Sequence, residues 1–155
     1  MTRTAARQLA IQLSFAANAG SDFGVEEFFD EEYFNALPAE DRIFSERPGE
    51  KQKQYILALV NGVREHLEEL DGYISRYSHG WKISRISKTA LSVLRCAMYE
   101  ILYMPDIPPA ASINEAVELA KGFDEPETVS FINGILGSFY QGLEAEREAP
   151  EAEEE

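Results

Sequence analysis

Two arginines near the start of the chain could bind phosphate groups. Arg3 and Arg7 are four residues apart, so on a helix with about 100° per residue they share one face. Guanidinium groups hold phosphates in a forked geometry, and the free amides of a helix start add further donors. The same spacing also fits two solvated arginines on the surface, and spacing alone favours this second interpretation over a phosphate site.

A second basic cluster follows the single tryptophan. Lys82, Arg85 and Lys88 come directly after Trp81, and clustered cations beside an aromatic ring can bind nucleic acid. These three cations are therefore candidates for additional RNA contacts. The alternative is a solvated loop in which Trp81 packs on the core.

An aromatic residue near the C-terminus could stack on an unpaired base. Phe131 lies about 120° from the centre of the apolar stripe of its predicted helix. Glu127 lies one turn earlier on the same side. An exposed aromatic ring in such a place is typical of single-stranded RNA recognition. Packing of Phe131 against a neighbouring helix fits the pattern equally well.

Patterns typical of catalysis or metal binding are missing from the sequence. His66 and His79 have no cysteine or second histidine at ligand spacing. Cys96 could be activated by Arg95, but it flanks an apolar helix stripe and is predicted to be a buried structural cysteine. No phosphate-binding glycine loop, nucleophile elbow or dinucleotide motif occurs. The sequence predicts no enzyme, no cofactor and no metal.

Apolar residues spaced three and four apart predict that helices position all of these side chains. No segment shows the pattern of a strand, so we expect an all-α fold. Ser87 should cap the helix that Pro105 ends, and Gly134 and Gly137 suggest close approach of another helix to the last one. The predicted helices cover 3–18, 25–37, one long stripe in 51–80, 88–104, 110–123 and 126–143, with a loop over 42–50.

Composition places limits on the kind of protein. A chain of 155 residues with 45% hydrophobic residues can form one domain with a core, and no run reaches the roughly 18 apolar residues of a membrane span. The lone cysteine fits a reducing compartment. The net charge of −14 argues against nucleic-acid binding, but 21–50 and 143–155 contribute −8 and −6 of it. Any RNA site must therefore be local.

The C-terminal half of the chain resembles the NusB family of bacterial transcription antitermination factors. The resemblance rests on Arg95–Tyr99–Glu100, Asp106-Ile107-Pro108, the run 113–121 and the run 131–136, in this order and spacing. The first helix and residues 55–81 are also similar to the family, so the match covers about 3–143.

The resemblance implies an all-helical fold of about seven helices arranged as two packed helical bundles. The domain would span 1–143, followed by an acidic, disordered tail over 144–155. It implies a cytoplasmic protein that binds boxA RNA of ribosomal RNA operon transcripts together with NusE, a small-subunit ribosomal protein, in the RNA polymerase antitermination complex. The helix over 88–102 would face NusE. The implied RNA-binding residues are Arg3, Arg7, Glu127, Ser130 and Phe131.

Departures from the family leave alternatives open. Thr4, Ala5 and Ser130 stand where many members carry basic residues, so fewer phosphate contacts and weaker RNA binding are expected. Arg95 and Glu100 match the family but should serve structure, in an interhelical pair or as caps. The alternatives are a NusE-binding module with little RNA affinity and the RNA-recruiting domain of a ribosomal RNA methyltransferase. The chain could be a monomer or a homodimer.

Overall fold

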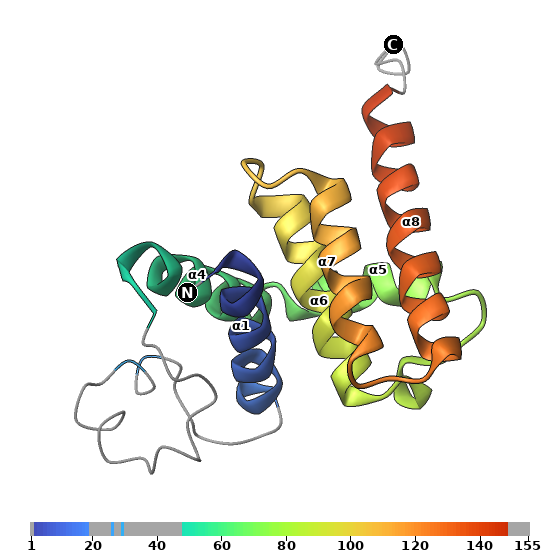
Figure 1. Ribbon diagram of the computed structural model, residues 1–155. Coiled ribbons are helices and arrows are strands. Elements are labelled where there is room, and N and C mark those ends of the chain that lie inside the picture. Colours follow the sequence, from blue (N-terminus) through green and yellow to red (C-terminus); the bar gives the residue numbers. More distant parts are fainter. Residues whose placement is uncertain (1, 19–25, 27–28, 30–47, 149–155) are drawn as a thin grey trace.

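The described part of the chain folds into helices, which from Glu50 onward are joined by short connections, as a computed structural model shows. The structure describes residues 2–18, 26, 29 and 48–148. Within these residues there is no strand. Apart from residues 26 and 29, the helix predicted over 25–37 lies outside them, as does most of the loop predicted over 42–50. The elements are α1 (Arg3–Ala17), α4 (Glu50–Glu65), α5 (Leu67–Tyr77), the 3₁₀ turn η2 (Ile83–Arg85), α6 (Lys88–Tyr103), α7 (Pro109–Lys121) and α8 (Pro126–Glu148) (Figure 1).

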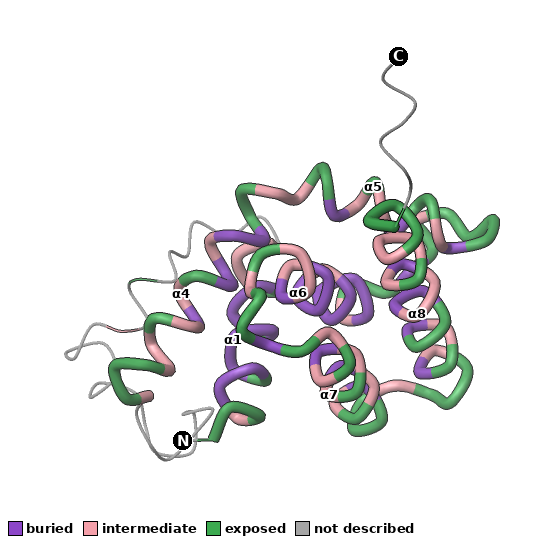
Figure 2. Tube along the Cα trace, turned by 90° about the horizontal axis from the view of Figure 1, so that it is seen from above, coloured by how far each residue is buried: buried purple, intermediate pink, exposed green. Residues whose placement is uncertain are grey.

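Helix α6 is the centre of the fold. It packs against α1 and α4 on one side and against α5, α7 and α8 on the other, and Figure 2 shows its mostly buried turns in the middle of the molecule. From Ala90 to Met98 every residue except Arg95 is buried, so neighbours pack on several of its faces at once. The expected all-α fold of two packed helical groups is confirmed.

The long helix predicted within 51–80 is wrong, because the structure divides it at His66 into α4 and α5. The apolar spacing continues across the break, so periodicity alone could not reveal it. The break lets α4 pack on α1 while α5 turns to pack on α8. A methyl group at Gly62, one turn before the break, would overlap the ring of Tyr99. Glycine at this position therefore allows α6 to pack closely against the end of α4.

Helix starts and ends follow the predicted chemistry. Ser87 caps α6, its hydroxyl oxygen accepting a hydrogen bond from the Ala90 amide at 3.1 Å. The same helix ends at Tyr103, two residues before Pro105. Pro126 begins α8, which continues to Glu148, five residues beyond the predicted boundary at 143. Residues 149–155 lie outside the described part of the chain.

A buried ion pair joins the first helix to the central one. Arg7 donates from Nε and Nη2 to the two carboxylate oxygens of Glu100, at 2.8 and 2.9 Å. Tyr55 of α4 and Ser112 of α7 donate their hydroxyls to the same carboxylate, at 2.7 and 3.0 Å. Burial opposes the charge of Arg7, but its bonds with Glu100 outweigh this and raise the pKa of Arg7 above its ordinary value. One carboxylate thus ties four helices together.

Arg95 makes the second interhelical pair. It donates from Nε and Nη2 to the carboxylate of Asp71 on α5, at 2.7 and 2.9 Å. Together with the Glu100 pair, this confirms that Arg95 and Glu100 serve the structure. Cys96, between them on α6, is fully buried as predicted, and burial raises the pKa of its thiol to about 12.

The expectation for Gly134 and Gly137 is wrong. Nothing lies within 4 Å of a methyl group placed at either position, so no described helix approaches α8 there. The close approach occurs one turn later, where the hydroxyl of Tyr77 on α5 occupies the space beside Gly142. Among the described helices, none combines the length and apolarity needed to cross a membrane.

Candidate nucleic-acid interface

The two N-terminal arginines have different surroundings. Arg7 is only 4% exposed and its guanidinium is held by Glu100, so it is neither a solvated side chain nor free to meet a phosphate. Arg3, at the first turn of α1, is exposed and lies over the ring of Tyr55, 5.7 Å from the ring centroid. Of the predicted pair, only Arg3 presents its charge to solvent, because α4 and α6 cover the helix from its second turn onward.

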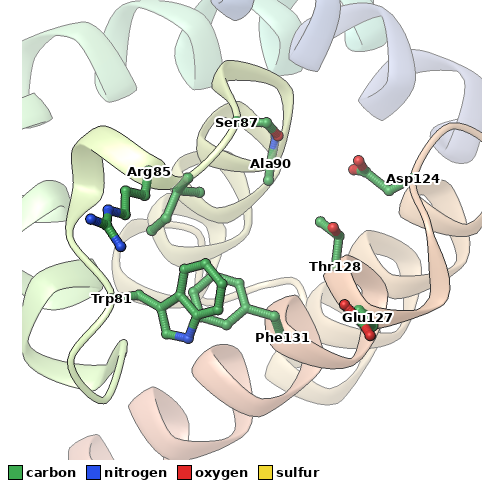
Figure 3. A pocket seen from close by; sticks show the side chains of 9 residues that line it. Trp81, Arg85, Ser87, Ala90, Asp124, Glu127, Thr128 and Phe131 are labelled. Carbon is green, nitrogen blue, oxygen red and sulfur yellow. The ribbon is translucent and has the colours of Figure 1, made fainter.

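Phe131 lines a cavity of about 220 Å³ between the start of α8 and the segment before α6. Its ring lies beside that of Trp81, with ring centroids 5.5 Å apart and planes tilted by 53°. Phe131 is half-buried and packs against the core, whereas Trp81 is 57% exposed. This aromatic cavity (Figure 3) is lined by Trp81, Arg85, Ile86, Ser87, Ala90, Asp124, Glu127, Thr128 and Phe131.

A tight turn after α5 brings Trp81 to this place. His79 and Gly80 both have positive φ, at 50° and 93°, a left-handed conformation that reverses the chain within two residues. The buried Ser78 hydroxyl donates to the carbonyl oxygens of both Ser75 and Trp81, at 3.1 and 2.8 Å. This turn fixes the backbone from which the indole ring extends toward α8.

Two carboxylates border the aromatic cavity. Glu127 is exposed in the first turn of α8, one turn before Phe131 as predicted. Asp124, just before the helix, has one buried oxygen without a hydrogen-bond partner among the described residues, and burial raises the pKa of its carboxyl group. Ser130 is exposed but does not line the cavity.

The three cations of the second basic cluster do not all line the same cavity. Arg85 lines the aromatic cavity and also an adjoining one of about 300 Å³, the basic cavity, whose lining residues are His79, Gly80, Trp81, Lys82 and Arg85. Lys88 instead lines a separate cavity of about 140 Å³, which it shares with Phe15 and Asn18 at the end of α1 and with Leu91, Ser92 and Arg95 of α6. Within the described part of the chain, none of the three cations makes an ion pair.

The predicted RNA-binding residues therefore form two groups. Phe131, Glu127 and Arg85 lie together around the aromatic cavity. Arg3 lies at the other end of α1 from Phe15, twelve residues or about 18 Å along the helix axis. In Figure 1 the end of α1 and the starts of α6 and α8 face the same way, so the cavities share one end of the molecule.

The exposed position of Trp81 at this site was missed from the sequence, where the alternative of a solvated loop packed its ring on the core. The helical period of apolar residues stops at Tyr77, so no stripe accounts for the indole, and Lys82 follows it directly. An aromatic residue outside any apolar stripe and next to cations is the pattern that indicates its exposure.

The arrangement suits recognition of an unpaired nucleotide. Exposed aromatic faces stack on bases, and nearby cations meet the phosphates that flank a base. No group of three or more metal-ligating side chains occurs among the residues that the structure describes.

Comparisons with known proteins identify the family. The NusB family model matches residues 4–141. The transcription antitermination protein NusB of Acetivibrio thermocellus is 43% identical over 137 residues, covering 88% of this chain and 87% of the relative. A structure of T. maritima NusB is 28% identical with a TM-score of 0.72, covering 91% of this chain and 92% of that one.

A structure of antitermination factors NusB and NusE in complex with double-stranded RNA has the same fold. It is 21% identical with a TM-score of 0.70, and the match covers 90% of this chain and 96% of that chain. The family model spans nearly all of the described helices, and the sequence match extends over most of the relative's length. The chain therefore belongs to the NusB family.

Proposed function

We propose that this chain is a transcription antitermination factor. It binds boxA-type single-stranded RNA of ribosomal RNA operon transcripts together with NusE, as part of the RNA polymerase antitermination complex. It acts in the cytoplasm, as a binding protein without catalytic activity. Its membership of the NusB family and the names of its relatives support this proposal.

The observation that carries the proposal is the aromatic cavity. Trp81, which is exposed, and the half-buried Phe131 line this cavity beside Arg85, which has no ion-pair partner among the described residues. A base that stacks on either ring gains about 1–3 kcal/mol. This local site reconciles RNA binding with a net charge of −14, because only the charges near the RNA determine its attraction.

The remaining RNA contacts are assigned to those predicted residues whose side chains are exposed. Arg3 supplies a phosphate contact from the start of α1, Glu127 lies at the aromatic cavity with the base-stacking ring, and Ser130 offers an exposed hydroxyl next to Phe131 in the sequence. Arg7 acts as a positioning residue, since it fixes α1 through Glu100. A single exposed arginine in place of a cluster is consistent with RNA binding that depends on the basic surface of a partner.

The NusE-facing surface includes the first turns of α6. Phe15 is 38% exposed at the end of α1, and it borders the cavity that Lys88 and Leu91 line. Aromatic residues are enriched at the centres of protein–protein interfaces, and a charged side chain such as Lys88 suits the polar rim. The surface lies next to the aromatic cavity, so NusE and RNA could be bound side by side.

RNA-binding measurements test the proposal. Fluorescence anisotropy with labelled boxA RNA should give tighter binding to the chain plus NusE than to the chain alone. Phe131→Ala should weaken binding by about 1–3 kcal/mol, whereas Tyr103→Ala, which removes an aromatic residue with 40% exposure on another surface, should not. Equal binding of a scrambled RNA in the presence of NusE would contradict the sequence-reading role.

A second candidate is a NusE-binding module with little RNA affinity. The buried ion pair of Arg7 with Glu100 favours this second candidate, because the pairing leaves only one exposed arginine on α1. A titration of NusE in the absence of RNA separates the two functions: this candidate predicts tight NusE binding that boxA RNA does not change. Light scattering on the same samples distinguishes a monomer from a homodimer.

A further inference from the structure

The basic cavity next to Trp81 has a composition that suits an anion. Its lining side chains are those of His79, Trp81, Lys82 and Arg85, with Gly80 between them. No acidic residue lines it, although the chain carries twice as many acidic as basic side chains. A cavity that lacks carboxylates in so acidic a protein is a local region of positive potential.

The backbone holds the two cations on one side. Arg85 donates its backbone amide to the carbonyl of Lys82 at 2.9 Å, which closes the 3₁₀ turn. Lys82 precedes the turn with an extended backbone, and its side chain and that of Arg85 line the same basic cavity. The turn thereby arranges two positive charges around one space.

Lys82 and Arg85 form no ion pair with any residue that the structure describes. By contrast, Arg95 and Glu100 of the following helix α6 are paired with Asp71 and Arg7. Neither Lys82 nor Arg85 has such a partner among the described residues, and both are exposed. Two exposed, unpaired cations in a fixed arrangement can take one shared anion with little reorganisation.

The basic cavity adjoins the aromatic cavity, since Trp81 and Arg85 line both. A nucleotide has the same two parts, a flat aromatic base and a charged phosphate a few bonds away. We infer that the basic cavity binds a phosphodiester of the RNA backbone, next to the nucleotide whose base stacks at Trp81 and Phe131. This inference rests on the proposed function, and it assigns the phosphate to Lys82 and Arg85.

The salt dependence of boxA RNA binding tests the inference on the full-length chain with NusE present. Each phosphate contact with single-stranded RNA adds about 0.7 to the slope of log Kd against log salt concentration. The double variant should lower the slope by about 0.7, because both cations serve one phosphate, and Lys82→Gln and Arg85→Gln should each lower it by a part of this amount. The matched control is Arg64→Gln, which removes one exposed charge from the last turn of α4 and should leave the slope unchanged. A double variant with the wild-type slope would overturn the inference.

Neutral backbone substitutions identify the phosphate. In a set of boxA RNAs, each with one phosphate replaced by an uncharged methylphosphonate, one RNA should bind wild type and Arg85→Gln equally. That result means that the contact of Arg85 is already lost with this phosphate. If Arg85→Gln weakens the binding of every RNA in the set by the same factor, Arg85 does not bind an RNA phosphate and the inference is wrong.

Phe131→Ala separates this inference from the function on which it rests. If wild type binds boxA RNA and Phe131→Ala weakens binding, but the Lys82 and Arg85 variants keep the wild-type slope, only the phosphate site is wrong. If wild type binds no boxA RNA even with NusE, both proposals are wrong.

Discussion

Replacing Glu100 by glutamine should reveal how strongly the buried ion pair holds α1 in place. The carboxylate accepts four hydrogen bonds: Oε1 from Arg7 and Ser112, and Oε2 from Arg7 and Tyr55. Glutamine keeps the shape but turns one of these oxygens into a donor. The facing hydroxyl can rotate and accept, whereas a guanidinium has only donors, so the loss falls on Arg7.

The expected magnitude follows from the burial of the pair. Arg7 and Glu100 are 4% and 1% exposed, and removal of one partner of a buried pair typically costs about 3–5 kcal/mol. Since domains are stable by about 5–15 kcal/mol in total, Glu100→Gln should remove a large part of the free energy of unfolding. By contrast, Glu118→Gln breaks an exposed pair with Lys121 and should cost about 0–1 kcal/mol.

Urea denaturation followed by circular dichroism measures these changes, with a common slope against urea as the check on two-state unfolding. Arg7→Met combined with Glu100→Gln should be more stable than the sum of the two single changes implies, with a coupling energy of about 0.5–3 kcal/mol. A loss below about 1 kcal/mol for Glu100→Gln, or strict additivity, would refute the reasoning. If Glu100→Gln fails to fold, Tyr55→Phe removes one 2.7 Å bond to the same carboxylate and should cost about 1.5–3 kcal/mol.

Three further predictions concern stability. Gly134→Ala should raise the melting temperature, because the position is open and alanine favours a helix by about 0.5–1 kcal/mol. Gly62→Ala should lower the free energy of unfolding by about 1–3 kcal/mol, since a methyl group would overlap the Tyr99 ring. The native Cys96 thiol should not react with a disulfide reagent at pH 8 until urea unfolds the chain, because its pKa is raised to about 12. Between the ordinary thiol value of 9.0 and about 12, the unfolded thiol loses its proton while the folded one keeps it. The free energy of unfolding should therefore fall with rising pH in this range, and less steeply in Cys96→Ala.

The parts of the fold that could be predicted are those that local chemistry decides. Ser87 and Pro126 mark helix starts because capping and proline geometry depend on a few neighbouring residues. The break at His66 could not be predicted, since the apolar spacing runs through it and the packing of α4 and α5 on different helices decides it.

The candidate site was predictable to a similar degree. Helical geometry places Phe131 beside Glu127, and the structure puts both at one cavity. Arg7 was the residue most open to misinterpretation, because its partner Glu100 is 93 positions away. Spacing on one helix tells which side chains are neighbours but not what covers them. The meeting of Trp81 with Phe131 likewise depends on a turn and a helix that are distant in the sequence.

The separation of Arg7 from Glu100 also affects how the chain assembles during synthesis. A ribosome adds about 5–20 residues per second, so the 93 positions between the two partners take roughly 5–20 s to emerge. Throughout this interval Arg7 lacks Glu100, and the apolar face of α1 over Leu9 and Leu13 lacks the central helix that later covers part of it, although α4 can already pack on α1. The buried pair of Arg7 with Glu100 can therefore form only after α6 has emerged, and Ser112 adds its hydrogen bond once α7 follows.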